Sequence, residues 1–366
     1  MEKLTFLDYS LKNIPIAGQK PYMKQLINQT CNLIRKCRWK AFFHENKNAR
    51  GDDFPTYGFK SSKPTPAMPK LFPFENALYD LVCNVKFDPY RTKFQKQLSR
   101  DIRKIRDSKD VLVKADKTTN VYAVPPDTYN KLLNDSITKD YRKAEPNVKQ
   151  NIDEKGRNIA RGLRLADRME VIAERDAFIT LKDHKEDFNR KPAVRLINPT
   201  RDEIGVVSKH LLAKINTRVR KSTGFNQWQS TGQVIDWFKK LPNRQSRKFI
   251  KFDIVSFYPS ISEDLLTNSL SYARTITDIS TEDEAVIWHA RHSLLFSKGT
   301  AWVKKDNPDF DVTMGAYDGA EVCELVGLFL LSQLSEKLGI EDCGLYRDDG
   351  LSAKAENGPQ ADRLIN

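Results

Sequence analysis

The sequence has few cysteines and no long apolar run. Its five cysteines are Cys31, Cys37, Cys83, Cys323 and Cys343, and no two of them have Cys-x-x-Cys spacing. This pattern is typical of reduced thiols in a nuclear or cytoplasmic protein. No apolar segment approaches the length that spans a bilayer, and the first residues lack the apolar core of a signal peptide. We therefore expect a nuclear or cytoplasmic protein with no membrane partner.

Histidine is also scarce, with five in 366 residues. His289 and His292 lie three residues apart on a predicted helix. Neither a cysteine nor a pair of carboxylates lies near them at the spacing of a zinc site. The sequence therefore indicates ordinary core or surface histidines at these two positions.

Acidic residues are outnumbered by basic ones, 48 against 61, which gives a formal charge of +13. Charged residues make up 30% of the chain and hydrophobic residues 39%, as in a globular protein with a charged surface. The excess of positive charge favours a polyanion such as nucleic acid over a small neutral metabolite. The length leaves room for two or three domains.

Residues 1–108 are predicted to form a basic, mainly helical extension. Four basic residues are interleaved with apolar ones early in it: Arg35, Lys36, Arg38 and Lys40. The stretch from Arg91 to Arg106 holds seven basic residues and one acidic residue. Its apolar residues recur at helical spacing: Phe94, Leu98, Ile102 and Ile105. One face of this helix should pack, and the other either contacts phosphates or is simply solvated.

Two predicted hairpins follow. In the first, residues 111–113 and 121–124 flank a polar turn that contains Asp116 and Lys117. In the second, strands end at residue 181 and begin at residue 193 around a basic loop. Its candidate phosphate-binding residues are Lys182, Lys185 and Arg195. An ordinary charged hairpin explains this stretch equally well when it is taken alone.

The segment 249–261 predicts a buried strand that ends at Asp253, followed by a turn and a helix. Ser260 with Glu263 fits a capping box at the start of that helix. A buried carboxylate is costly, so Asp253 should have a polar partner or a cation. Taken alone, the same pattern also fits an aspartate that caps a turn.

Two later segments carry related features. The loop 314–320 contains Gly315, which would allow another backbone to approach closely before a long apolar helix begins. Residues 343–353 predict a hairpin with Asp348 and Asp349 in its turn. Adjacent carboxylates repel each other unless a cation offsets their charge, which indicates a divalent metal.

Together, Asp253, Asp348 and Asp349 predict a site for phosphoryl transfer to a growing nucleic acid. That chemistry uses two Mg²⁺ ions about 3.5–4 Å apart, and carboxylate oxygens are suitable ligands. We therefore expect the three aspartates to converge although the first lies far from the others in the sequence.

These motifs resemble those of reverse transcriptases, most closely the Penelope-like and related non-viral retroelement enzymes. The match to the first palm motif is Phe252-Asp253-Ile254 with Phe257-Tyr258, to the second Met314-Gly315 with the following helix, and to the third Tyr346-Arg347-Asp348-Asp349. The basic strand pair with Lys182, Lys185 and Arg195 is similar to the fingers motif. The hairpin with Asp116 and Lys117 resembles a segment ahead of it.

The resemblance implies an α+β right-hand polymerase fold. Residues 1–108 would be an extension, 109–248 the fingers, and 249–366 an incomplete palm with an antiparallel sheet backed by helices. It also implies an RNA-directed DNA polymerase of a transposable element. Such a nucleotidyltransferase adds deoxynucleotides to a DNA primer on an RNA template with two Mg²⁺ ions, or Mn²⁺ in their place.

The resemblance also assigns roles to individual residues. Asp253, Asp348 and Asp349 would be catalytic and would hold the metal together with the backbone of Ile254. The substrate-binding residues would be Lys182, Lys185, Arg195, Tyr258 and Gly315. Tyr258 would exclude a ribose 2′-hydroxyl, with plain core packing as the alternative.

Some features depart from the family pattern. Arg347 stands where a small or apolar residue is usual, and Ala316-Tyr317 replaces a frequent serine-proline pair. The sequence stops at Asn366, before the expected thumb, as in a C-terminally truncated enzyme. A non-catalytic RNA-binding remnant is therefore one alternative. A family B DNA polymerase is less favoured, because the paired aspartates of those enzymes are not adjacent.

Overall fold

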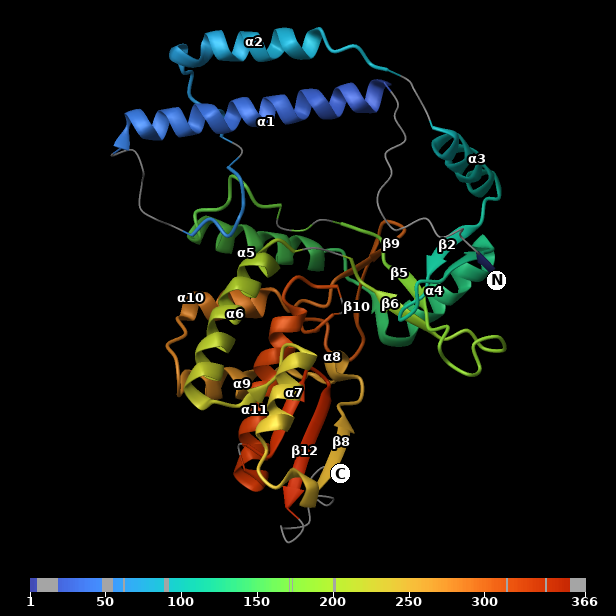
Figure 1. Cartoon of the computed structure of the whole chain (residues 1–366), viewed down its shortest axis with the longest axis vertical. Helices are drawn as coiled ribbons and strands as arrows, with labels where there is room; N and C mark the ends of the chain where they lie inside the picture. Colours follow the sequence, from blue (N-terminus) through green and yellow to red (C-terminus); the bar gives the residue numbers. More distant parts are fainter. Residues whose placement is uncertain are drawn as a thin grey trace. The chain divides into compact units, whose positions relative to one another are not determined.

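The computed structural model describes residues 1–4, 19–47, 55–61, 63–88, 92–170, 172, 174–199, 202–313, 315–339 and 341–355. These residues form a mixed α/β structure in which many helices accompany several small sheets (Figure 1). None of the helices described is both long and apolar enough to cross a membrane.

The chain divides into two compact units. The first comprises residues 1–56, 60–132 and 181–193, and the second comprises residues 57–59, 133–180 and 194–366. These units cut across the predicted ranges, because the loop 181–193 groups with the N-terminal part while most of residues 133–248 group with the C-terminal part. The assignment of ranges to extension, fingers and palm stays a prediction.

The first unit combines helices with one small antiparallel sheet. Its elements are β1 (Glu2–Leu4), α1 (Gln19–Glu45), the 3-10 turn η2 (Pro69–Leu71), α2 (Phe72–Cys83), α3 (Lys93–Asp107), β2 (Val111–Lys114) and β3 (Val121–Val124). The predicted basic helices and the predicted hairpin are present. The strand order β1-β3-β2 adds an N-terminal strand that was not expected, because three residues carry too little pattern to predict a strand.

The second unit is larger. After α4 (Pro126–Asp140), which begins in the first unit, its elements are β4 (Tyr141–Lys143), α5 (Val148–Gly162), β5 (Phe178–Leu181), β6 (Val194–Ile197), α6 (Ile204–Thr223), β7 (Asn226–Gln227), α7 (Thr231–Lys240), η3 (Arg244–Ser246), β8 (Arg247–Asp253), α8 (Phe257–Ser260), α9 (Glu263–Arg274), α10 (Thr281–His289), β9 (Leu295–Ser297), β10 (Thr300–Lys304), α11 (Gly319–Leu338), β11 (Cys343–Tyr346) and β12 (Asp349–Ala355). The hairpins expected around residues 181–193 and 346–349 are present as β5-β6 and β11-β12.

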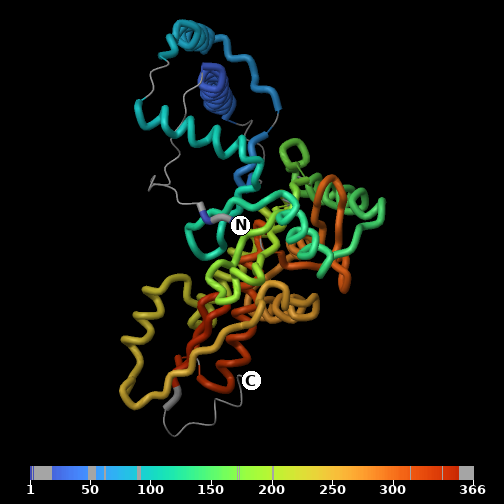
Figure 2. Tube along the Cα trace, turned by 90° about the vertical axis from the view of Figure 1, so that its right-hand side faces the viewer, coloured from blue at the N-terminus to red at the C-terminus, as the bar shows by residue number. Residues whose placement is uncertain are grey.

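A four-stranded sheet with the order β7-β11-β12-β8 organises the second unit. β8 and β11 each run antiparallel to β12, and Figure 2 shows β8 in orange beside the red β12. The sequence predicted the β11–β12 hairpin. β7 differs because it pairs parallel to β11. This two-residue strand follows Gly224, whose φ of +70° ends α6 in the left-handed region that glycine adopts without strain.

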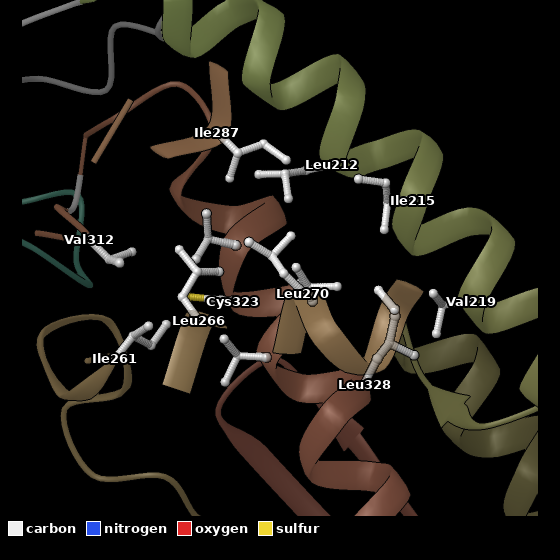
Figure 3. Packing of buried hydrophobic residues seen from close by; sticks show 14 of the residues in the cluster. Leu212, Ile215, Val219, Ile261, Leu266, Leu270, Ile287, Val312, Cys323 and Leu328 are labelled. Atoms are coloured by element: carbon white, nitrogen blue, oxygen red, sulfur yellow. The ribbon is translucent and has the colours of Figure 1, made fainter. Parts of the chain in front are cut away.

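Helices α6, α9 and α11 enclose the main hydrophobic core (Figure 3). Helix α11 is apolar on most of its surface, which is typical of a helix buried between other elements. Leu325 and Leu328 of α11 pack there with Leu212 of α6 and Leu266 of α9, each 0% exposed. Burying such a side chain contributes about 1.5–3 kcal/mol, so this core fixes α6 and α9 against α11.

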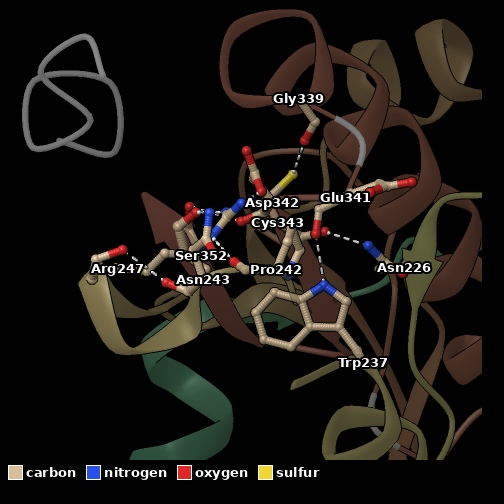
Figure 4. Close-up of polar contacts among 12 residues, drawn as sticks. Asn226, Trp237, Pro242, Asn243, Arg247, Gly339, Glu341, Asp342, Cys343 and Ser352 are labelled. Carbon is tan, nitrogen blue, oxygen red and sulfur yellow. Dashed lines mark hydrogen bonds and ion pairs between the residues drawn. The ribbon is translucent and has the colours of Figure 1, made fainter. Parts of the chain in front are cut away.

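Polar contacts hold the end of the sheet that is remote from Asp253 (Figure 4). The indole Nε1 of Trp237 donates to the Glu341 carbonyl at 2.7 Å. Arg247, the first residue of β8, pairs with Asp342 and donates to the Ala353 carbonyl at 3.0 Å. Because Arg247 is fixed at one end of β8, the register that places Asp253 at the other end is well defined.

Candidate active site

Asp253 and Asp349 lie directly opposite each other in the β8–β12 pairing. In the neighbouring residue pair, the Ile254 N–H donates a hydrogen bond of 2.8 Å to the Asp348 carbonyl. Since hydrogen-bonded and non-hydrogen-bonded pairs alternate in antiparallel sheets, Asp253 and Asp349 form a non-hydrogen-bonded pair. The α-carbons of such pairs are about 4.5 Å apart, so the two side chains are close neighbours on the same face of the sheet.

The backbone geometry therefore brings Asp253, Asp348 and the partly buried Ile254 together with Asp349, as expected from the sequence. Their roles in catalysis and metal binding stay predictions. Like charges at directly opposite strand positions destabilise a sheet, so a cation between Asp253 and Asp349 would be favourable.

The expectation that Asp253 is buried is wrong. Asp253, Asp348 and Asp349 are all exposed. The physical reason is the position of β8 at the edge of the four-stranded sheet, where only alternate residues such as Ile250 and Phe252 turn inward. Water therefore solvates the carboxylates. Repulsion between Asp253 and Asp349 across the strands, and not burial, is what would favour a bound cation.

One carboxylate of the site already has a basic neighbour. The Lys251 Nζ lies 3.6 Å from Asp349 Oδ1, and the two side chains are 76% and 55% exposed. An ion pair this exposed contributes about 0–1 kcal/mol, so Lys251 is a weak and displaceable partner.

The turn between β11 and β12 has an unusual backbone. Tyr346 pairs with Asp349, which leaves Arg347 and Asp348 as a two-residue turn. Arg347 has φ +58°, in the region where glycine or asparagine is usual. Non-glycine residues in that region cost about 1–3 kcal/mol and gather at functional sites.

The predicted capping box of Ser260 with Glu263 is wrong. The chain instead makes the short helix α8, and Ser262 is the N-cap of α9, with its hydroxyl accepting from the Leu265 N–H at 3.1 Å. Ser260 bonds back to the carbonyls of Val255 and Ser256. Serine at both positions made the sequence pattern ambiguous, and Ser262 is the one with the extended backbone of an N-cap.

Tyr258 lies in α8 at the margin of the main core, half-buried. Burial, followed by the neighbouring thiol of Cys323, raises the pKa of Tyr258 to about 12. A β-carbon on Gly319 would be 3.2 Å from the Tyr258 ring, so glycine at the start of α11 gives the ring its space. This position is compatible with the predicted contact to a sugar and with plain packing.

Gly315 lies against the strand end of β6. It has φ +112°, and a β-carbon there would be 2.5 Å from the Asn198 carbonyl oxygen. The close backbone approach predicted for this loop is therefore confirmed at Gly315. The other residue of that motif, Met314, lies outside the described residues.

A buried charged group supports the end of the same loop. Arg291 and Asp318 form an ion pair in which each side chain is 1% exposed, and Asp318 also accepts from the Ser208 hydroxyl. Breaking a buried pair by removing one partner usually costs about 3–5 kcal/mol, because the other charge stays buried. The pair therefore fixes the loop to α6 and to the segment after α10.

The predicted substrate-binding residues do not all lie in one unit. Lys182 and Lys185 belong to the first unit, whereas Arg195 lies in β6 of the second. Arg195 is thus in the β5-β6 pair and not in the sheet that carries Asp253.

Asp183 joins the two predicted hairpins within the first unit. Its Oδ2 accepts from the Thr118 hydroxyl at 2.7 Å, the Asn120 Nδ2 at 2.6 Å and the Tyr122 hydroxyl at 3.1 Å. Burial tends to raise the pKa of Asp183, but these hydrogen bonds outweigh it and the pKa is lowered. The basic loop is therefore held in a defined conformation.

Two of the basic residues interleaved with apolar ones in α1 have partners within the protein. Arg38 forms a two-point ion pair with the buried Glu75 of α2, and Arg35 donates to the carbonyls of Ser61 and Lys63. Arg91, at the start of the other basic stretch, lies outside the described residues. The basic face of α3 stays a prediction.

One cluster of polar side chains was missed from the sequence. Asp202, His289 and His292 come together in the second unit. Burial raises the pKa of Asp202 to about 8 and lowers those of His289 and His292 to about 3 and about 4. The histidine spacing was visible in the sequence, but the carboxylate comes from a distant segment, so no spacing rule could join it to them.

Comparisons with known proteins find no matching family model and no matching curated protein. Among solved structures, the chain is similar to telomerase from Candida albicans in complex with a TWJ fragment of telomeric RNA, with a TM-score of 0.41 and 12% identity over 98% of this chain and 68% of that chain.

Proposed function

We propose that this chain is a reverse-transcriptase-like polymerase of the kind found in non-viral retroelements, with Asp253, Asp348 and Asp349 as its metal-binding carboxylates. The proposal rests on the sequence motifs that resemble those enzymes. The observation that carries it is the direct cross-strand pairing of Asp253 with Asp349, because it joins two motifs that lie far apart in the chain.

The donor set suits a hard divalent cation. Three exposed carboxylates offer only oxygen ligands, and Mg²⁺ is bound in proteins through one or two carboxylates while it keeps several waters. Asp253 and Asp349, with Asp348 beside them, would hold the ions. Bound Mg²⁺ would supply charge neutralisation for the nucleotide phosphates and activation of the primer hydroxyl.

The other residues of the proposal have supporting roles. Gly315 lets its loop approach Asn198, and Tyr258 would contact the sugar of the incoming deoxynucleotide. Lys182, Lys185 and Arg195 would neutralise its phosphates. An RNA template and a DNA primer would be the macromolecular partners.

Primer extension tests the proposal. The chain is given a DNA primer on an RNA template, deoxynucleotides and Mg²⁺, and the products are sized on a denaturing gel. We expect extension by the parent chain and a loss of at least about a hundredfold in Asp253→Asn and in Asp349→Asn, since the ions provide several kcal/mol of transition-state stabilisation. Asp306→Asn, at an exposed aspartate, is the matched control and should extend like the parent. Equal extension by Asp253→Asn and the parent would refute the assignment.

A second candidate is a nucleic-acid-binding protein that no longer polymerises. The observation that favours it is the Lys251–Asp349 ion pair, which places a positive charge at the proposed metal site. Binding without extension would support this candidate. Binding of primer-template in either case should weaken steeply with salt, because contacts by lysine and arginine release counterions.

A further inference from the structure

Asp202, His289 and His292 converge although they come from two distant segments. Asp202 lies just before α6, His289 is the last residue of α10, and His292 follows it by three residues. The Nε2 atoms of the histidines are 3.3 Å apart. The Oδ2 of Asp202 is 3.5 Å from Nε2 of His289 and 4.0 Å from Nε2 of His292.

These separations match the ligand shell of a tetrahedral metal. Ligand atoms that lie 2.0–2.1 Å from zinc at tetrahedral angles are about 3.3–3.4 Å from one another. Two of the three separations fit this value closely, and the third exceeds it by about 0.6 Å, which a small side-chain rotation would remove. Each residue contributes a single atom to these separations, so one ion could contact all three.

Hydrogen bonding within the protein accounts for only part of the cluster, because the two histidines can share one hydrogen bond between their Nε2 atoms while Asp202 takes no part in it. Oδ1 of Asp202 accepts from the Ile204 N–H at 2.8 Å, which orients the carboxylate at the start of α6. Its other oxygen, Oδ2, is buried and has no hydrogen-bond partner among the residues that the structure describes. A buried carboxylate oxygen without a partner is costly, so a cation facing it would be stabilising.

Among the residues that the structure describes, the charges around the cluster are balanced. Arg291 lies between the two histidines in sequence, but it is paired with Asp318. Among the described residues, Lys155 also lies near the histidines, and Glu203 is a further acid near Asp202. The carboxylate of Asp202 is thus the group left to offset the charge of a bound ion.

We propose that Asp202, His289 and His292 bind a Zn²⁺ ion. Two imidazole nitrogens and one carboxylate oxygen are a ligand set that zinc takes in proteins, whereas Mg²⁺ prefers oxygen ligands alone. A cavity of about 40 Å³ adjoins Asp202 and His292. It has room for a water molecule as the fourth ligand.

The zinc site has a structural role. It joins the start of α6 to the end of α10. The adjoining cavity is also lined by Tyr317 and Asp318, which follow Gly315, and by Asn198, which follows β6. A metal there would stabilise the contact between α6 and α10 next to the Gly315 loop. The site is separate from the proposed carboxylate site and does not depend on the polymerase function.

Metal titration of the full chain tests this proposal. The protein is stripped with a chelator, and Zn²⁺ is added while bound metal and the melting temperature are measured; Co²⁺ serves as a visible-spectrum probe of tetrahedral nitrogen ligation. We expect one tightly bound Zn²⁺ per chain and a rise in melting temperature, since a ligand that binds only the folded state stabilises it. Asp202→Asn should weaken Zn²⁺ binding at least about tenfold.

The variant His289→Gln with His292→Gln should lose the bound Zn²⁺ and the Co²⁺ spectrum. His44→Gln, at an exposed histidine of α1, is the control and should keep both. If the double variant does not fold, His292→Gln alone replaces it, because that side chain is 16% exposed. A folded parent that binds no Zn²⁺, or a histidine variant that binds Zn²⁺ as tightly as the parent, would overturn the proposal.

Discussion

A β-carbon at Gly315 would lie 2.5 Å from the carbonyl oxygen of Asn198. Real side chains do not approach that closely, and the φ of +112° is also unfavourable for any other residue. We therefore expect Gly315→Ala to lower the free energy of unfolding by about 2 kcal/mol or more in urea denaturation. Gly162→Ala is the control, because no atom of the described residues lies within 4 Å of its β-carbon position and its φ is not positive. A Gly315→Ala protein as stable as the control would show that the loop moves without cost.

The three hydrogen bonds to Asp183 predict a pH-dependent contribution to stability. The folded-state pKa of Asp183 is lowered, so the contribution is present above the ordinary carboxyl pKa and is lost as the pH falls through the folded-state value. We expect Asp183→Asn to destabilise the chain by roughly 1–2 kcal/mol at pH 7 and by less near pH 3. Asp187→Asn, at an exposed aspartate of the same loop, should have little effect at either pH. A difference between parent and Asp183→Asn that does not shrink in acid would contradict this account.

Arg347 provides a test of backbone strain in the turn that carries Asp348. Arg347→Ala and Arg347→Gly both remove the side chain, but only glycine removes the cost of φ +58°. We expect the glycine variant to be the more stable of the two by about 1 kcal/mol, measured by chemical denaturation. Equal stability of the two would mean that the turn relaxes readily and stores no strain.

Tyr258 separates a packing role from a substrate-contacting role. Tyr258→Ala should lower stability by about 2 kcal/mol because the ring packs at the margin of the main core. If the ring also excludes the 2′-hydroxyl, the same variant should incorporate ribonucleotides that the parent rejects, whereas Tyr258→Phe should behave like the parent in both respects. Loss of stability with unchanged rejection of ribonucleotides would leave Tyr258 as packing alone.

The sequence predicted the local elements of the site better than their environment. The strand that ends at Asp253, the hairpin with Asp348 in its turn, and the close approach at Gly315 were all visible, because turn residues and alternating patterns are local signals. Asp349 was expected in the turn, but it is the first residue of β12. The exposure of Asp253 was not visible, since it depends on β8 being the edge strand of a sheet whose order is set by distant pairings. Position in a sheet is a tertiary property that a single strand does not encode.

The same limit explains the cluster at Asp202. Its histidines were found by their spacing on one turn of chain, but the carboxylate reaches them only because α6 packs beside α10. Likewise, Arg38 lies in a basic stretch whose composition is compatible with nucleic-acid binding. Only the packing of α1 on α2 shows that Arg38 forms an ion pair with Glu75. Long-range partners of charged side chains were therefore the main information that the sequence lacked.

Mn²⁺ binding, followed by electron paramagnetic resonance, is the most direct test of the central claim that Asp253 and Asp349 share a divalent cation. The parent chain should bind Mn²⁺, and Mg²⁺ should compete for it, because the two ions accept the same oxygen ligands. Asp253→Asn and Asp349→Asn should each bind Mn²⁺ at least about tenfold more weakly, while Asp306→Asn binds like the parent. His289→Gln with His292→Gln serves as a second control and separates this site from the histidine cluster. Mn²⁺ binding that is the same in the parent, Asp253→Asn and Asp349→Asn would contradict the shared site.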